Sequence, residues 1–397
     1  MRNPTKFLKE EYEELVRNGF DWKLRVLEGP SEPVCKVDGK KVLMLCSNNY
    51  LSLCNHPKVK KAALKAIKTH GAGAGSDRSI SGNTDLHVQL ERRLAKFKDA
   101  EASLVYQTGF MANEGLIPQL AGKGDIIISD ELNHGSIIDG MRLTKADRAI
   151  YKHRDTDELE KVLNEAEKHD PSYRRILIIT DGVFSMDGDI APLDEIAKIG
   201  SRHGAMIYVD DAHGEGVLGD GGRGAVDHFK LSRKDIQVEV GTFSKAFGVM
   251  GGHISGSSDL YSFAYNKSRT WLLSGATPPS VAASCTAAID VLETEPEWVR
   301  NLWDNTRYFK KAVEQLGFDT GSSQTPIIPI IVGESLLAQT VSEKLFDKGI
   351  FAFPIVFPMV AKDKARIRTQ MNAALTKDHL DKAINAFEVI GKELSII

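Results

Sequence analysis

The chain has 397 residues, of which 42% are hydrophobic and 26% charged, a composition typical of a globular protein with more than one lobe. Its 51 basic and 54 acidic residues give a net charge of -3, so neither nucleic acid nor an anionic membrane is expected as a partner. No apolar stretch approaches the roughly 20 residues that span a bilayer. The N-terminus lacks the apolar segment of a secretory signal, and the 4 cysteines show no metal-ligand spacing. We therefore expect a cytoplasmic enzyme with reduced thiols and no metal site.

The N-terminal part is predicted to be an arm, residues 1–45, that leads into a large domain, 46–285, and a smaller C-terminal domain, 286–397. A glycine-rich segment, "HGAGAGSDRSISG", follows the lysine-rich helical pattern "KVKKAALKAIKTH". It does not match GxGxxG and it follows a helix rather than a strand, so a dinucleotide loop is not indicated. Residues 71–82 are therefore interpreted either as a loop that lines a site or as a purely structural turn.

From about residue 100, short β-branched runs alternate with helical patterns such as "DELEKVLNEAEKH" and "PLDEIAKIGSRHG". Nearly continuous apolar strands between helices predict an α/β fold with a mainly parallel sheet covered on both faces. Ligands of such sheets bind at the carboxyl ends of the strands. The predicted strands are residues 103–106, 125–129, 175–180, 206–210 and 236–240.

The first two predicted strands each end near a group that could bind a ligand. The first ends in Thr108, Gly109 and Phe110 and runs into a helical pattern. A small-residue turn that opens a helix exposes backbone N–H groups suited to a phosphate. The second strand is followed by His134. Taken alone, the turn is more typical of a plain strand–helix connection, and the histidine of a loop or a satisfied core residue.

The next two strands deliver acids and further polar groups. Residues 175–180 run into "TDGVFSMDGD", which delivers Asp181, Ser185 and Asp187 in a segment too polar for the core. Asp210 lies at the tip of the apolar strand "MIYVD", and His213 follows three residues later. A carboxylate at the end of a buried strand is costly without a partner. It therefore either caps a neighbouring turn or meets a cation inside a site.

Lys245 lies in "GTFSKAFG", among small residues just past the last of these strands. A phosphate cradle, a stacking ring, a buried acid and an isolated lysine on successive strands of one sheet together favour pyridoxal 5′-phosphate (PLP) as cofactor. The Lys245 amine would form a Schiff base with the cofactor, Asp210 would keep the pyridine nitrogen protonated, and Thr242 would reach the phosphate.

After "GATPPS" at 275–280, a long helical region is predicted from about Val281 to Leu316. It is followed by "PIIPIIVG", a helix through "LLAQTVSEKLF" and the strand-like "ARIRTQM". The final helix is predicted to begin near Thr376, a plausible N-cap, and to carry apolar residues on one face. This succession predicts a small α+β lobe.

Six motifs occur in the order and spacing of one family: "SNNYLSL", "GAGAGSDRSISGN", "TDGVFSMDGD", "VDDAHGEGVLG", "GTFSKAFG" and "ARIRTQMNAAL". From about residue 20 to the C-terminus, the chain resembles the PLP-dependent α-oxoamine synthases, which join an amino acid to an acyl-CoA thioester. The resemblance implies the fold type I PLP-dependent transferase (aminotransferase-like) architecture. It also implies a homodimer with shared active sites.

The resemblance further implies roles for individual residues. Lys245 would be the Schiff-base lysine and Asp210 the partner of the pyridinium nitrogen, while His134 would stack on the ring. The remaining cofactor contacts implied are His213 and Ser185 near the phenolic oxygen, Thr108, Gly109, Phe110, Thr242 and, from the other subunit, Ser274.

The resemblance also assigns the substrate contacts. Asn48 and Arg368 would hold the amino-acid carboxylate, for which a guanidinium is a natural bidentate clamp. Without the resemblance, Arg368 would be interpreted as a surface charge on an edge strand. Arg25 would lie near the acyl-CoA.

Within the family, "ARIRTQM", the ending "GKELSII" and "SDELNHGSIIDGMRL" look most like glycine C-acetyltransferase. The expected reaction is therefore condensation of glycine with acetyl-CoA to give 2-amino-3-oxobutanoate and CoA. The alternatives within the family are 8-amino-7-oxononanoate synthase, 5-aminolevulinate synthase and serine palmitoyltransferase. Leu375, where the family usually has histidine, and Gly275, at a position that is polar in relatives, leave the acyl chain open.

Two hypotheses outside the family remain at this point. Another fold type I enzyme, an aminotransferase or lyase, would act without acyl-CoA. A non-catalytic partner subunit would keep the fold, but such a subunit has no need of Lys245, Asp210 and His134 together. An NAD-dependent oxidoreductase is compatible with the fold class alone but lacks its sequence fingerprint.

Overall fold

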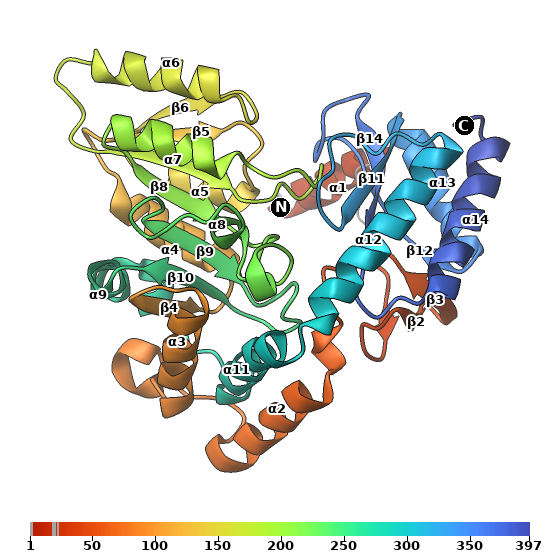
Figure 1. The fold of residues 1–397 in the computed structure, drawn as a ribbon, viewed down its shortest axis with the longest axis horizontal. Coiled ribbons are helices and arrows are strands. Elements are labelled where there is room, and N and C mark those ends of the chain that lie inside the picture. Colours follow the sequence, from red (N-terminus) through yellow and green to blue (C-terminus); the bar gives the residue numbers. More distant parts are fainter. Residues whose placement is uncertain (1–2, 18–20, 22–23) are drawn as a thin grey trace.

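The computed structural model describes residues 3–17, 21 and 24–397, so residues 1–2, 18–20 and 22–23 of the predicted arm lie outside the described residues (Figure 1). The largest sheet has seven strands in the order β4-β10-β9-β8-β7-β5-β6. Neighbours are parallel except at β10, which is antiparallel to both β4 and β9. The predicted mainly parallel α/β sheet is thus confirmed. Its strands are β4 (Ala102–Tyr106), β5 (Ile126–Asp130), β6 (Asp147–Tyr151), β7 (Ile176–Asp181), β8 (Met206–Asp210), β9 (Val238–Thr242) and β10 (Gly252–Gly256).

Alternate residues of the central strands enter two different cores. In β7, Ile178 packs in the core that includes helices α6 (Thr156–Glu167) and α7 (Leu193–Arg202). Its neighbours Leu177 and Ile179 pack in the core that includes α4 (Gly109–Leu120) and α5 (Gly135–Arg142). Successive side chains of a strand point to opposite faces. Because both faces are covered, the strands are apolar along their whole length.

A smaller lobe lies beside this sheet (Figure 1). Its antiparallel sheet has the order β11-β14-β13, from β11 (Ile327–Gly333), β14 (Ala365–Gln370) and β13 (Phe353–Ile355). It packs with α13 (Ser335–Asp347), and α14 (Lys377–Glu393) completes the lobe. The Thr376 hydroxyl accepts a hydrogen bond from the backbone N–H of His379, which confirms the predicted N-cap of α14.

Part of the predicted arm pairs with the C-terminal lobe. The strands β1 (Leu27–Glu28), β2 (Val34–Val37) and β3 (Lys40–Met44) form a sheet with β12 (Ile350–Phe351), in which β3 and β12 are parallel. The first described helix, α1 (Lys6–Arg17), has no buried residue. None of the described helices is long and apolar enough to cross a membrane.

Differences between the sequence interpretation and the structure have identifiable physical reasons at several elements. The helical region predicted from Val281 to Leu316 is two helices, α11 (Pro279–Thr294) and α12 (Glu297–Leu316). Pro296 separates them, because proline lacks an N–H and disfavours a helical conformation at the residue before it. Strand β6 was missed because it is a largely exposed edge strand, and β10 because its five residues begin and end with glycine.

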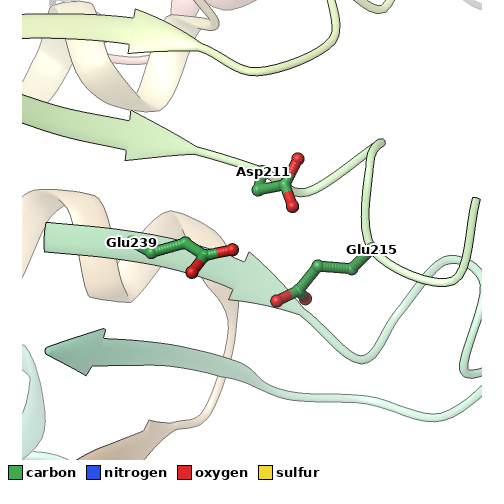
Figure 2. A group of neighbouring side chains, drawn as sticks. All are labelled: Asp211, Glu215 and Glu239. Carbon is green, nitrogen blue, oxygen red and sulfur yellow. The ribbon is translucent and has the colours of Figure 1, made fainter. Parts of the chain in front are cut away.

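A buried ionic cluster underlies the ends of β8 and β9. The carboxylates of Asp211, Glu215 and Glu239 converge there (Figure 2). The ammonium group of Lys98 lies among them, 2.9 Å from Glu215 Oε1, 3.8 Å from Asp211 Oδ2 and in direct contact with Glu239. Burial alone would lower the pKa of Lys98, but the three carboxylates raise it above its usual value. The Lys98 ammonium thus lies among three carboxylates whose spacing would otherwise suit a metal ion.

The cluster supports the adjacent strand ends through close packing. A Cβ on Gly241 would lie 2.1 Å from Glu215 Oε2, so only glycine fits between the cluster and the end of β9. His253 Nε2 on β10 lies 2.9 Å from Glu215 Oε2, and Arg233 Nη2 lies 2.6 Å from Glu239 Oε2. These ion pairs therefore connect the chain after β8 with β9 and β10.

We expect Lys98→Met to lower the free energy of unfolding of the apoprotein by about 3–5 kcal/mol, because removing one partner of a buried ion group leaves uncompensated charge. Urea unfolding followed by circular dichroism measures the change. Lys96→Met, at an exposed position of α3 (Asp85–Phe97), the helix for which Lys98 is the C-cap, is the matched control and should change stability by less than about 0.5 kcal/mol. Equal stability of the Lys98 and Lys96 variants would contradict the role assigned to the cluster.

Candidate active site

A cavity of about 210 Å³ lies at the carboxyl ends of β5, β7, β8 and β9. This is where ligands bind to parallel α/β sheets. The cavity is lined by nine of the residues singled out in the sequence: Thr108, Gly109, Phe110, His134, Ser185, Asp210, His213, Thr242 and Lys245. The structure therefore brings together residues that are up to 137 positions apart in the chain.

One wall of the cavity is the N-terminus of α4. The Thr108 hydroxyl caps this helix and accepts a hydrogen bond from the N–H of Met111 at 3.1 Å. A Cβ on Gly109 would lie 3.3 Å from Thr242 Cβ, so glycine allows the helix start and the end of β9 to approach closely. Exposed N–H groups at the positive end of a helix dipole, beside threonine hydroxyls, suit a phosphate group.

Asp210 lines the cavity from the end of β8, and only 6% of it is exposed. Its Oδ2 accepts a hydrogen bond of 2.6 Å from Asn113 Nδ2, and its Oδ1 accepts one of 3.1 Å from the N–H of Ala212. These donors stabilise the ionised carboxylate, which is the form that can pair with a protonated ring nitrogen. Sequence reasoning missed Asn113; its only signal was a polar residue on an otherwise apolar helix face.

Lys245 lines the cavity just past β9. Burial lowers the pKa of Lys245 to about 8, while the carboxylates of Asp210 and Asp181 act in the opposite direction. An ordinary lysine is almost fully protonated at neutral pH, and only the free amine is a nucleophile or base. The lowered pKa therefore gives Lys245 a usable fraction of free amine near neutral pH.

His134 is held as the N-cap of α5. Its Nδ1 accepts from the N–H of Ser136 at 3.2 Å and lies 2.7 Å from the Ser136 hydroxyl. Because Nδ1 accepts, the proton of the neutral ring is on Nε2. Burial lowers the pKa of His134 below its usual value, which favours this neutral ring. A flat neutral imidazole in the wall of the cavity can stack on an aromatic cofactor.

Hydrogen bonds connect His213 with Asn48, one of the substrate-binding residues that the resemblance implies. Its Nδ1 lies 2.8 Å from the Tyr50 hydroxyl, and burial, followed by the nearby cations Lys245 and Arg368, lowers its pKa well below the usual value. The amide of Gln370 lies 3.1 Å from the Tyr50 hydroxyl and 2.7 Å from Asn48 Oδ1. Tyr50 and Gln370, which sequence reasoning did not single out, thus connect Asn48 with the cavity.

Arg368 reaches the loop after β7 from the small lobe. It lies on β14, and its Nη1 donates to the backbone carbonyl of Ser185 at 3.2 Å. Its Nε is buried and has no hydrogen-bond partner in the described structure. A guanidinium beside the cavity, with an N–H group that has no acceptor, suits a carboxylate ligand.

Two of the singled-out residues lie elsewhere. Arg25 lines a second cavity, of about 410 Å³, in the small lobe. Its guanidinium lies 3.0 Å from Asp38 Oδ2 and 3.7 Å from the centre of the Phe346 ring. Ser274 does not line the first cavity; its carbonyl accepts from Gln107 Nε2 at 3.3 Å. The role of Ser274 in a second subunit therefore stays a prediction.

The glycine-rich segment 71–82 packs against the chain around Ser274. The N–H of Ala276 donates to the Ser76 carbonyl at 3.0 Å, and Gly275 forms a β-bridge with Asp77. The segment is anchored by Arg78, whose buried guanidinium is paired with Glu91 through both nitrogens. Leu375, the other departure noted in the sequence, is 5% exposed and part of the apolar core.

The residues of the first cavity fit PLP. A helix N-terminus and threonines are available for the phosphate, a buried anion for the ring nitrogen, a neutral imidazole for the ring face and a lysine for the aldehyde. A Cβ on Gly109 would press on Thr242, so glycine brings the N–H groups of the helix start beside the Thr242 hydroxyl, a combination suited to a phosphate.

Comparison with known proteins agrees with this geometry. Residues 40–387 match the family described as aminotransferase class I and II. The chain is 53% identical over 391 residues to 8-amino-7-oxononanoate synthase of Thermoanaerobacter pseudethanolicus, covering 98% of each chain. It is 51% identical over 393 residues to the enzyme of the same name from Symbiobacterium thermophilum, covering 99% of each.

Solved structures show the same architecture. Serine palmitoyltransferase from S. paucimobilis, solved with a bound PLP–myriocin adduct, is similar over 100% of both chains with a TM-score of 0.93 and 29% identity. An 8-amino-7-oxononanoate synthase from Francisella tularensis is similar over 89% of this chain and 98% of its own, with a TM-score of 0.77 and 28% identity. These likenesses confirm the predicted fold type I architecture and PLP as cofactor.

The lowered pKa of Lys245 predicts the pH dependence of cofactor loading. We expect the rate at which the apoprotein takes up PLP, followed by the absorbance of the imine, to rise with a midpoint near pH 8. An exposed lysine would react with a midpoint near its ordinary value of about 10.4. Asp210→Asn should move the midpoint lower still, because the carboxylate of Asp210 opposes the effect of burial. A midpoint near that of free lysine would contradict the environment described for Lys245.

Proposed function

We propose that this chain, which belongs to the α-oxoamine synthase family of PLP-dependent enzymes, forms 8-amino-7-oxononanoate. The observation that carries the proposal is 53% identity, over 98% of both chains, to a relative of that name. The sequence motifs favoured glycine C-acetyltransferase, and the relatives do not support that preference. They support the alternative within the family.

The name of the relatives' product defines the substrates. A nine-carbon acid with a ketone at carbon 7 and an amine at carbon 8 has its first seven carbons from an acyl thioester that ends in a carboxylate. Carbons 8 and 9 are the α-carbon and methyl group of alanine. The proposed reaction is therefore alanine plus a pimeloyl thioester, giving the amino ketone, carbon dioxide and the free thiol, with all atoms accounted for.

Bound PLP supplies an electron sink for the negative charge that develops at the α-carbon of the amino acid. Asp210, which accepts hydrogen bonds from Asn113 and from the N–H of Ala212, would stabilise positive charge at the ring nitrogen. Arg368 and Asn48 would hold the amino-acid carboxylate. Lys245 Nζ, with its pKa lowered to about 8, would accept and return the proton at the α-carbon.

The test is thiol release by PLP-loaded protein with alanine, glycine or serine against acetyl-, succinyl-, pimeloyl- and palmitoyl-CoA. We expect the highest kcat/KM for alanine with pimeloyl-CoA, with one carbon dioxide released per thiol. Lys245→Ala should abolish thiol release and the imine absorbance, whereas Lys267→Ala, at an exposed lysine of α9 (Ser258–Lys267), should change neither.

The other outcomes separate the competing assignments. A preference for glycine with acetyl-CoA, without carbon dioxide, would replace the proposal by glycine C-acetyltransferase. A preference for another pair would keep the chemistry but change the substrates. Absence of thiol release with every pair, from protein shown to carry PLP, would overturn the proposal.

A further inference from the structure

Two carboxylates face the same cavity from neighbouring strands. Asp181 and Asp210 are register partners of the parallel pair β7–β8, each is 6% exposed, and both line the cavity. Two buried like charges at such positions are costly to ionise together. Burial and the charge of Asp210 raise the pKa of Asp181 well above its usual value. One of the two acids therefore keeps its proton in the cofactor-free protein, and the surrounding donors must select which one.

The donors available to the two carboxylates differ. Asp210 accepts from the side chain of Asn113 at 2.6 Å and from the N–H of Ala212 at 3.1 Å. The carboxylate of Asp181 accepts from the N–H of His134 at 3.0 Å. Hydrogen bonds to the ionised form favour it. Both carboxylates accept from a backbone N–H, but only Asp210 also accepts from a side chain, the amide of Asn113.

The orientation of this amide is set by a buried tyrosine. Asn113 on α4 is fully buried, and its Oδ1 accepts a hydrogen bond of 2.6 Å from the hydroxyl of Tyr208 on β8. A phenol hydroxyl in this apolar environment stays protonated, since burial raises the pKa of Tyr208 well above its usual value. Because Oδ1 accepts this hydrogen bond, the Nδ2 group of Asn113, with both of its hydrogens, points away from Tyr208. One reaches Asp210 Oδ2, and the other reaches Ser136 Oγ at 2.8 Å.

The second hydrogen of the Asn113 amide connects Asp210, through Ser136, with His134, the residue expected to stack on the cofactor ring. Because Ser136 Oγ accepts from Asn113, its own hydrogen is available for His134 Nδ1 at 2.7 Å. The chain of donors therefore runs from Tyr208 through Asn113 to Asp210 and, through Ser136, to His134. Each hydrogen bond in this chain has a defined donor and acceptor. A flip of the Asn113 amide would therefore break the bond from Tyr208.

We propose that Asn113 is a positioning residue that assigns the negative charge to Asp210 rather than to Asp181, and so keeps the anion where the ring nitrogen of the cofactor binds. The inference rests on the role proposed above for Asp210. The other titratable or charged groups around the pair come from several elements, and none of them donates a side-chain hydrogen bond to either carboxylate: Asp130 on β5, His134, His213, Lys245 and Arg368.

The charge can be measured in the apoprotein, by carbon-13 NMR of protein labelled at the aspartate carboxyl carbons. Asp210→Asn and Asp181→Asn assign the two resonances. In the wild-type protein, we expect the carboxyl of Asp181 to titrate above its usual range, because burial and the charge of Asp210 raise its pKa. In Asn113→Leu, which has a similar volume and no donor, the midpoint of Asp210 should rise by about one to two pH units, and the Kd for PLP by about ten- to a hundredfold, as expected for a lost hydrogen bond to a charged group.

A rescue experiment separates charge selection from a purely structural role. Asp181→Asn removes the competing acid, so Asn113→Leu should change the Asp210 midpoint and the Kd for PLP less in the Asp181→Asn background than in the wild-type background. The part that remains is the direct loss of the hydrogen bond from Asn113. Packing damage at Asn113 would not be repaired by a substitution on β7. Failure of the rescue would overturn the proposal.

Tyr208→Phe provides a milder variant if Asn113→Leu does not fold. It keeps both amide hydrogens but releases the amide orientation, so the Asp210 midpoint should rise by less than in Asn113→Leu. Tyr106→Phe is the matched control, since it removes a buried hydroxyl that bonds to Ser268 Oγ at 2.8 Å instead. Equal Asp210 midpoints in wild type, Tyr208→Phe and Asn113→Leu would overturn the proposal. Because no substrate is present, failure here is distinct from failure of the proposed reaction.

Discussion

The adjacent acids Asp210 and Asp211 at the end of β8 are the constraint around which this structure is organised. Both are buried, and they are compensated by different elements. Asp211 lies 3.8 Å from the ammonium group of Lys98 and accepts a bond of 2.9 Å from the N–H of Ala225. Asp210 has the neutral donor Asn113 and faces the cavity. The acid inside the core thus shares the Lys98 ammonium with two other carboxylates, and the acid in the cavity remains able to pair with the charge of a ligand.

The loop after β7 connects this charged end of the sheet with the small lobe. Arg366 donates to the Met186 carbonyl at 2.9 Å and Arg368 to the Ser185 carbonyl at 3.2 Å. The loop carries Gly188 at φ 73°, and a Cβ there would lie 2.3 Å from the Ile327 carbonyl. The position of Arg368 relative to the cavity thus depends on a glycine in the other lobe. A substrate carboxylate on Arg368 would be held by a residue whose placement is already fixed by backbone contacts.

Much of this arrangement was predictable from the sequence, because strand ends of a parallel sheet converge wherever the strands lie in the chain. The strand 206–210 was predicted with the bounds that the structure shows, and nine singled-out residues line one cavity. Asn113 was not found, because a buried polar residue on a helix has meaning only through partners on other elements. Tyr50 and Gln370 were missed for the same reason, since the bond between them spans 320 positions of the chain.

The same physical reasoning explains why the motifs indicated the chemistry but not the substrate. Enzymes of one family share the acid, the base and the carboxylate clamp, because the charge that develops at the α-carbon is the same in all of them. Alanine differs from glycine by one methyl group, which is worth about 0.8 kcal/mol when buried. Discrimination of this size is spread over the walls of a pocket, where each residue contributes a fraction of it and none forms a motif. The comparison at 53% identity runs over 391 residues, so it spans the walls of the pocket as well as the motifs. Whole-chain similarity is therefore the more sensitive guide to the substrate, while local motifs are the more sensitive guide to the reaction.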